Sequence, residues 1–224
     1  MKYAIGIDVG GTNIRIAVVD ENGQLHDVYK ESTIATDIES LRKQILSLIK
    51  RIDLNKYKIE GIGIGGGLVM NKKMIVGKNG LAQEIGSMIV KNGGRAPSIF
   101  KAKGCIEGEA SGTMLTIKAN ELGLNAKNAG DVFVLASQGN QVALNLKNEF
   151  ISDVAAFIGS IVAYMEPDIF VLGGGLMKSK DFFLEELIKK VDDYVYESLK
   201  GNIKIVCAKY DQDCGIIGAA MQCF

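Results

Sequence analysis

A short polar stretch near the start of the chain contains residue types that bind phosphate groups and a metal ion. A carboxylate is followed by small and polar residues, in the order Asp8, Gly10, Gly11, Thr12 and Asn13, within the segment IGIDVGGTNIRIAVVD. Glycines allow backbone N–H groups to approach an anion closely, and a nearby carboxylate can hold a metal ion through water. The stretch therefore favours a hairpin that binds nucleotide phosphates. The alternative is a surface hairpin that needs glycine only for its turn.

Two further glycine clusters follow, Gly65, Gly66 and Gly67 and, much later, Gly173, Gly174 and Gly175. The first cluster lies in GIGIGGGLV and matches the G-x-G-x-x-G dinucleotide pattern, but that pattern needs a helix directly after it. Here a strand, a turn and a strand follow, which favours a second phosphate-binding hairpin over a bend in a twisted sheet. The last cluster lies between a buried strand and a helix, where the backbone can approach an adenosine or form a packing turn.

The elements that must position these clusters alternate between strand and helix patterns. Residues 5–20 are expected to form two strands of a hairpin, and residues 24–32 add a third antiparallel strand. Further strands are expected over 59–64, 169–172 and 203–208, with a hairpin over 68–76. Helices are expected over 37–52, 107–121, 141–165, 181–199 and 215–221. This alternation predicts an α/β protein.

Composition excludes several functional classes. The 224 residues contain 26 Lys plus Arg and 26 Asp plus Glu, a balance that favours neither a nucleic-acid partner nor an anionic membrane. The cysteines Cys105, Cys207, Cys214 and Cys223 show no paired spacing and are typical of reduced thiols. The longest apolar run, 157–165, is too short to cross a bilayer, and no signal peptide is expected. We expect a cytoplasmic protein.

The order of the three glycine clusters resembles the sugar kinase, actin and Hsp70 superfamily, in which two domains clamp ATP between two phosphate loops and an adenosine loop. Within it, the chain is similar to the ROK family of bacterial sugar kinases and repressors. The matching stretches are IGIDVGGTNIRIAVVD, GIGIGGGLVMNKKMIVGKNGLAQEIGSM, GCIEGEASG, AGDVFVLASQGNQVALNLKNEF, EPDIFVLGGGLM and GIIGAAM. The resemblance implies a two-lobed actin-like ATPase (ribonuclease H-like) fold, with lobes over 1–62 and 63–224 and the last helix (215–224) packed back on the first lobe.

The resemblance also implies roles for individual residues. The three glycine clusters, with Thr12 and Asn13, would bind ATP, and Asp8 would hold Mg²⁺ indirectly. Glu84 in QEIGS and Glu107 in GCIEG match family carboxylates that accept hydrogen bonds from sugar hydroxyls. The alternative is that both are ordinary solvent-facing glutamates, as Glu109 is expected to be.

The chain departs from the family by an apparent internal deletion. Residues 59–65 are similar to a strand of the family's first lobe, and residues 61–76 are equally similar to its second phosphate hairpin, so the resemblance implies that the two segments have merged. The block normally between them carries the Asp that acts as catalytic base. No Asp occurs between Asp53 and Asp131. The sequence therefore offers no catalytic residue, and the first lobe is expected to be truncated.

The family's zinc site is also incomplete in this sequence. Ser87 occupies the position of a family histidine, and of three family cysteines only Cys105 has a counterpart. Structural zinc takes four ligands, so we expect no zinc.

Three functional hypotheses follow from the resemblance. The first is an ATP-dependent kinase of a hexose or N-acetylhexosamine, impaired by the missing Asp. The second is a non-catalytic descendant that binds a sugar, a nucleotide or a partner subunit. The third, a repressor, is disfavoured because the family's repressors place a helix-turn-helix before the first hairpin, and this chain starts directly with the hairpin. A homo-oligomer could cover the sheet edge that the shortened first lobe exposes.

Overall fold

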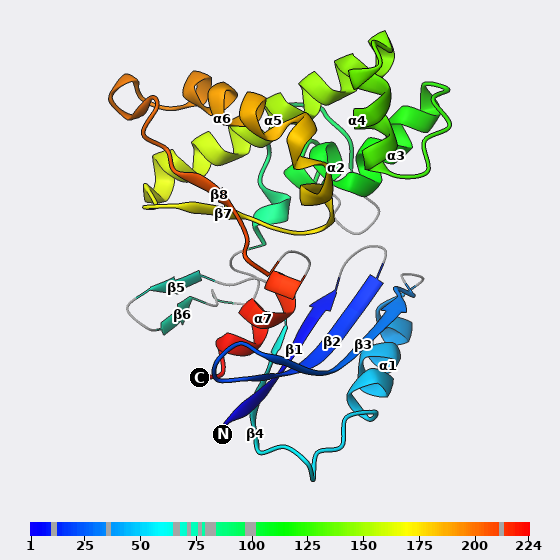
Figure 1. Cartoon of the computed structure of the whole chain (residues 1–224), viewed down its shortest axis with the longest axis vertical. Coiled ribbons are helices and arrows are strands. Elements are labelled where there is room, and N and C mark those ends of the chain that lie inside the picture. The colour runs from blue at the N-terminus through cyan, green and yellow to red at the C-terminus, as the bar shows by residue number, and fades with distance from the viewer. Residues whose placement is uncertain are drawn as a thin grey trace. The chain divides into compact units, whose positions relative to one another are not determined.

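The computed structural model describes residues 1–9, 13–34, 37–64, 68–70, 73–75, 78, 84–96, 102–210 and 213–224. The chain forms two compact units (Figure 1). Unit 1 consists of residues 1–83 and 209–224, and unit 2 consists of residues 84–208. The lobe boundary expected between residues 62 and 63 lies inside unit 1, and the last helix belongs to the same unit as the first strands.

Unit 1 is built on a four-stranded sheet in the order β3-β2-β1-β4. Its strands are β1 (Tyr3–Val9), β2 (Asn13–Asp20), β3 (Leu25–Ser32) and β4 (Ile59–Ile64). The pairs β1–β2 and β2–β3 are antiparallel and β4 runs parallel to β1, which confirms the predicted hairpin and the strands beside it. Ile62 on β4 is 48% exposed, although a buried strand was predicted, because β4 is an edge strand among the described residues.

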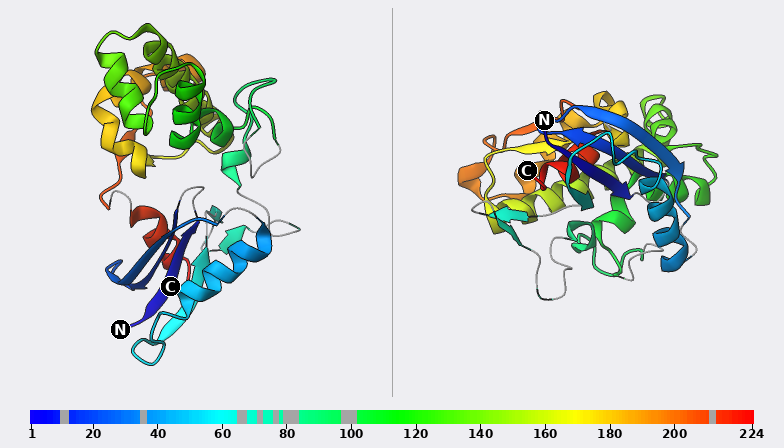
Figure 2. Two further views of the ribbon diagram at one scale, coloured as in Figure 1. Left: turned by 90° about the vertical axis from the view of Figure 1, so that its right-hand side faces the viewer. Right: turned by 90° about the horizontal axis from the view of Figure 1, so that it is seen from below.

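Helices cover both faces of this sheet (Figure 2). Alternating side chains of β1 and β2, such as Ile5 and Ile16, pack with Leu48 of α1 (Ile38–Ile49). The side chains of the opposite face, such as Ala4 and Val19, pack with Ile216 and its neighbours on α7 (Cys214–Met221). The period-two alternation of the strands thus supplies one apolar layer to each helix.

Glycine makes the close approach of α7 to the sheet possible. A Cβ added at Gly6 of β1 would collide with the backbone carbonyl of Ile216. A Cβ at Gly61 of β4 would lie 2.9 Å from Sγ of Cys223, just after the helix. The absence of side chains at these two positions therefore fixes how closely α7 packs on the sheet.

Unit 2 is mainly helical and surrounds the long helix α5 (Gln141–Met165). The other helices are α2 (Ile106–Ala110), α3 (Gly112–Glu121), α4 (Ala129–Ser137) and α6 (Leu184–Val191). The rings of Phe133, Phe150 and Phe183 form the centre of its core, with centroids 5.2–5.5 Å apart. Strands β7 (Phe170–Leu172) and β8 (Ile205–Cys207) form a short parallel pair. No helix in the described ranges combines the length and apolarity needed to cross a bilayer.

Two predicted helices are shorter than expected. The helix predicted over 107–121 is divided at Ser111, whose backbone is extended and whose side chain accepts the N–H of Met114 to begin α3. The helix predicted over 181–199 is regular only in α6. The carboxylate of Asp192 accepts the N–H of Gly201 at 2.8 Å, and the short 3₁₀ turns η3 (Asp192–Tyr194) and η4 (Glu197–Leu199) follow. Serine and aspartate compete with helical backbone bonding in this way.

The predicted hairpin after the second glycine cluster is present. It consists of β5 (Leu68–Met70) and β6 (Lys73–Ile75), which pair antiparallel. This arrangement, strand after strand with no helix, confirms that the G-x-G-x-x-G match is not a dinucleotide fingerprint.

Candidate functional site

Asp8 lies at the end of β1, directly opposite Arg15 of β2 in the antiparallel register. Burial raises the pKa of the Asp8 carboxyl, and the positive charge of Arg15 opposes part of that rise. Its carboxylate also lies against the first turn of α7, because a Cβ at Gly215 would be 3.1 Å from Asp8 Oδ2. The charged form of Asp8 is thus flanked by a guanidinium and by the positive end of a helix.

A second carboxylate reaches the same guanidinium. Asp213, the residue before α7, forms an ion pair with Arg15 and so connects the start of this helix to β2. The sequence reasoning missed both partners. Arg15 could have been identified from the sequence, because it lies two residues after Asn13 on the same face of a predicted strand. No sequence pattern pointed to Asp213, because its ion pair with Arg15 depends on where α7 packs.

The structure describes only part of the predicted phosphate loops. Gly10, Gly11, Thr12, Gly65, Gly66 and Gly67 lie outside the described residues. Asn13 is the first residue of β2 and is half-buried. These nucleotide-binding roles therefore stay predictions.

The third glycine cluster forms the turn between β7 and η2 (Gly175–Phe182). Gly174 has φ of +95°, a backbone conformation that favours glycine. A Cβ added at Gly174 or Gly175 would meet no atom within 4 Å, and Gly173 is exposed. The turn therefore leaves open space beside the backbone in unit 2, as an adenosine-binding turn requires.

Glu84 and Glu107, which are far apart in the sequence, come together in unit 2. Burial raises the pKa of Glu107, and the negative charge of Glu84 raises it further. Gly86 makes room for this arrangement, because a Cβ there would lie 3.1 Å from Glu107 Oε2. Neither carboxylate has a hydrogen-bond or ion-pair partner within the described ranges, so both can accept hydrogen bonds from a ligand.

Short-range backbone bonds position this pair of carboxylates. Glu84 precedes the 3₁₀ turn η1 (Ile85–Ser87), and Glu107 lies in the first turn of α2. The N–H of Ile106 donates to the carbonyl of Met88 at 2.9 Å, and the N–H of Val90 donates to the carbonyl of Gly104 at 2.8 Å. The segment after Glu84 is thereby attached to the residues just before Glu107.

Glu109 is not solvent-facing, and that expectation was wrong. The residue is 2% exposed, and its carboxylate forms an ion pair with Lys118 at 2.8 Å. A cation on the next helix satisfies the buried charge, which the local sequence pattern does not reveal.

The residues around Cys105 do not fit a structural zinc site. Cys105 is fully buried at the start of α2, and Ser87 ends η1. Between residues 85 and 105 the sequence contains one cysteine and no histidine, whereas structural zinc takes four such ligands. The absence of zinc stays a prediction.

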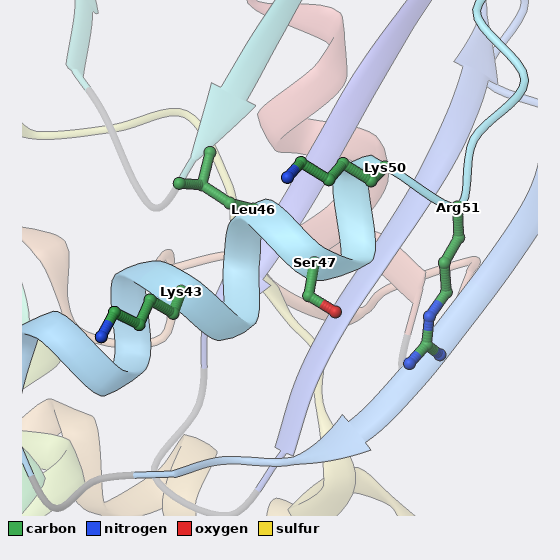
Figure 3. Close-up of a pocket in the computed structure, with 5 residues that line it drawn as sticks. All are labelled: Lys43, Leu46, Ser47, Lys50 and Arg51. Atoms are coloured by element: carbon green, nitrogen blue, oxygen red, sulfur yellow. The ribbon is translucent and has the colours of Figure 1, made fainter.

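A surface depression on unit 1 lies apart from these residues (Figure 3). It is lined by consecutive turns of α1 and the residues after it, namely Lys43, Leu46, Ser47, Lys50 and Arg51. Arg51 forms an ion pair with Glu31, and the depression contains none of the predicted site residues. We interpret it as a solvated basic face of α1.

Comparison with known proteins finds similarity along most of the chain. The ROK family model matches residues 4–64 and, separately, residues 57–223. Glucokinase from Thermotoga maritima is 29% identical over 174 residues, covering 71% of this chain and 55% of that protein. N-acetylmannosamine kinase from Yersinia pestis is 30% identical over 162 residues, covering 71% of this chain and 53% of that protein. The chain thus spans about half the length of these curated relatives.

A solved structure gives the fold. The ROK family glucokinase from Streptomyces griseus, crystallised with glucose and AMPPNP, has a TM-score of 0.74 at 19% identity, covering 97% of this chain and 98% of that one. The predicted fold class, a two-lobed actin-like ATPase fold with a reduced first lobe, is therefore confirmed. The two family matches share residues 57–64, as expected if two segments separated by a lost block have merged.

Proposed function

The chain belongs to the ROK family, and from this membership we propose that it binds a hexose or N-acetylhexosamine together with ATP and Mg²⁺, and that it phosphorylates the sugar weakly or not at all. The observation that carries the proposal is the meeting of Glu84 and Glu107 in unit 2. Two neighbouring carboxylates that have no hydrogen-bond or ion-pair partner among the described residues are suited to a ligand rich in hydroxyl groups, because charge-assisted hydrogen bonds are stronger than neutral ones.

The nucleotide part of the proposal is supported by Asp8 and the turn at 173–175. Asp8 is an oxygen donor at the end of β1, of the kind that Mg²⁺ prefers, and it would hold the ion through water. A bound Mg²⁺ would neutralise phosphate charge. Arg15 holds the Asp213 carboxylate, and its positive charge also favours the ionised form of Asp8.

Impaired catalysis is proposed because no Asp lies between Asp53 and Asp131. Phosphoryl transfer depends mainly on positioning and charge stabilisation, so loss of a base does not by itself abolish turnover. It does typically cost about 10²–10⁴-fold in rate. Glu107 has a raised pKa, but as a sugar-binding carboxylate it would be engaged with hydroxyl groups and not free to accept the reacting proton.

The second candidate function is a non-catalytic ROK descendant that binds a sugar, a nucleotide or a partner protein. The same missing Asp favours it. Both candidate functions allow ligand binding, so only a measurement of sugar phosphorylation distinguishes them.

Titration calorimetry with a panel of sugars tests the proposal. The panel contains glucose, mannose, N-acetylglucosamine, N-acetylmannosamine, fructose and allose, each with and without AMPPNP and Mg²⁺. Glu84→Gln and Glu107→Gln should each weaken binding of the preferred sugar by about tenfold or more, as expected for lost charged hydrogen bonds. Glu185→Gln, whose side chain is 83% exposed on α6, is the matched control and should bind like the wild type. Absence of sugar binding at millimolar concentration would refute the proposal.

A further inference from the structure

Unit 2 contains a partly buried group of charged residues that the proposed function does not use. We call it the Lys118 cluster, and its members are Lys91, Glu109, Lys118, Glu149 and Asp153. Lys118 is 7% exposed and Glu109 is 2% exposed. Charged residues are seldom buried to this degree unless they are paired, and Glu109 and Lys118 pair with each other.

The cluster has some features of a cation site, but a lysine already fills it. Oxygen atoms of Glu109, Glu149 and Asp153 lie within 4.8 Å of one another. Oδ2 of Asp153 is buried and has no hydrogen-bond partner in the described part of the chain. The ammonium of Lys118, however, lies 2.8 Å from Glu109 Oε2 and 3.0 Å from Glu149 Oε1. Its positive charge takes the place that a metal ion would need.

Glu109 uses its remaining capacity to hold a segment that has little regular structure. Its second oxygen accepts the backbone N–H of Arg95, and a Cβ on Gly94 would collide with the same oxygen. Lys118 also donates to the backbone carbonyl of Glu109 at 3.0 Å. Lys91, from the same segment, forms an ion pair with Glu149 of α5. The cluster therefore joins residues 84–96 to α2, α3 and α5.

The elements joined in this way are those that carry the proposed sugar ligands. Glu84 begins the segment 84–96, and Glu107 lies on α2 two residues before Glu109. Within the part of the chain that the structure describes, the segment contributes η1, an isolated bridge from Ile89 to Cys105 and a few backbone bonds to residues 104–106. Side chains that anchor such a loop add to these backbone bonds and hold its geometry more firmly.

We propose that Glu109 and Lys118 are positioning residues of the sugar site, which anchor the segment 84–96 on α2 and thereby set the separation of Glu84 from Glu107. This inference rests on the proposed function for its effect on sugar binding. Its structural half, the anchoring of the segment, can be tested whether or not a sugar binds.

The test combines amide hydrogen exchange with sugar binding. Glu109→Leu removes both the charge and the acceptor for Arg95, whereas Glu109→Gln keeps an acceptor and removes only the charge. Amides of residues 88–96 should exchange about tenfold faster or more in Glu109→Leu and less so in Glu109→Gln, while amides of α6 serve as an internal reference. Affinity for the preferred sugar should fall in the same order, with nucleotide affinity unchanged. Glu121→Gln, which removes only a surface ion pair to the Arg95 side chain, is the control.

The outcomes distinguish failure of the anchoring role from failure of the proposed sugar binding. Unchanged exchange in 88–96, or acceleration spread equally over unit 2, would overturn the anchoring role. Faster exchange with unchanged sugar affinity would show that the cluster supports the loop but does not position the sugar ligands, and would also overturn the inference. If the wild type binds no sugar, the proposed function fails and the exchange result still decides the anchoring. If Glu109→Leu does not fold, Glu109→Gln provides the result.

Discussion

The carboxylate of Asp8 lies against the backbone of Gly215, so closely that a Cβ at Gly215 would be 3.1 Å from Oδ2. This relationship links the candidate metal-binding residue on β1 to the first turn of α7, which is more than two hundred positions away in the sequence. The position of Asp8 therefore depends on how α7 packs, and on the absence of a side chain at one residue of that helix.

Gly215→Ala should weaken Mg²⁺-dependent nucleotide binding, because the added methyl group displaces the Asp8 carboxylate. We expect a loss of about tenfold, or 1.4 kcal/mol, measured by calorimetry with Mg-ADP. Gly218→Ala in the same helix is the matched control, since a Cβ there meets no atom within 4 Å. That control should be neutral or stabilise the protein by about 0.5–1 kcal/mol. Equal affinity in the two variants would contradict the role given to Gly215.

The stability of the protein should fall as pH rises through about 6, because of Asp153. Burial raises the pKa of this carboxyl from 3.8 to about 6. The positive charges of Lys91 and Lys118 oppose the rise, and the negative charges of Glu149 and Glu109 add to it. Since the folded pKa is higher than the unfolded one, the protonated form stabilises the fold fully below pH 4, and this contribution is lost as pH increases.

Asp153→Asn should remove that dependence. We expect the variant to be more stable than the wild type at pH 8 by about 1–3 kcal/mol, and to differ little from it at pH 4. Urea denaturation at pH 4, 6 and 8 measures both quantities. A variant that loses stability in parallel with the wild type over this range would show that another group titrates.

Lys118→Met should destabilise the protein strongly, because it removes the buried cation 2.8 Å from the Glu109 carboxylate and leaves only the more exposed Lys91, at 3.9 Å. Breaking a buried ion pair in this way costs about 3–5 kcal/mol. Lys189→Met removes an exposed ion pair with Glu185 on α6 and should cost less than about 0.5 kcal/mol. Urea denaturation of both variants gives the comparison, and similar small losses in both would mean that the Lys118 cluster contributes little.

Sugar phosphorylation should be very weak or undetectable in a coupled ADP-release assay over the six sugars of the binding panel. The reason is the missing Asp, since Glu84 and Glu107 would bind the sugar and Ser87 is a poor base at neutral pH. Turnover at ordinary kinase rates, about 1–100 per second, would mean that a substitute base exists. Glu107→Gln is then the first variant to assay, because the raised pKa of Glu107 suits a proton acceptor.

Much of the fold could be predicted because its signals are local. The alternation in β1 and β2, the helical spacing in α1 and α5 and the glycine turn after β7 each depend on neighbouring residues. The break at Ser111 was missed because a serine inside an apolar helical pattern can point to solvent or cap a new helix, and only packing decides between them.

The candidate site was predictable only in part. Glu84 and Glu107 were proposed as sugar ligands from the motifs around them, and the structure brings them near each other, but their sugar-binding role stays a prediction. Glu109 was misjudged because its cation, Lys118, lies on another helix. Asp213 was missed for the same reason, since its ion pair with Arg15 exists only once α7 has packed on the sheet. Long-range partners of charged residues are not encoded in the spacing of nearby side chains.

The packing of α7 on β1 and β2 has a consequence for biosynthesis. Ala4, Ala17 and Val19 are covered by residues 216–220, so this apolar side of the sheet has no cover while the ribosome is still translating the intervening 200 residues. Residues 84–208 form a continuous unit that can fold as soon as it emerges, whereas the discontinuous unit must wait for the last helix. During synthesis this apolar side of the sheet therefore stays uncovered until α7 has emerged.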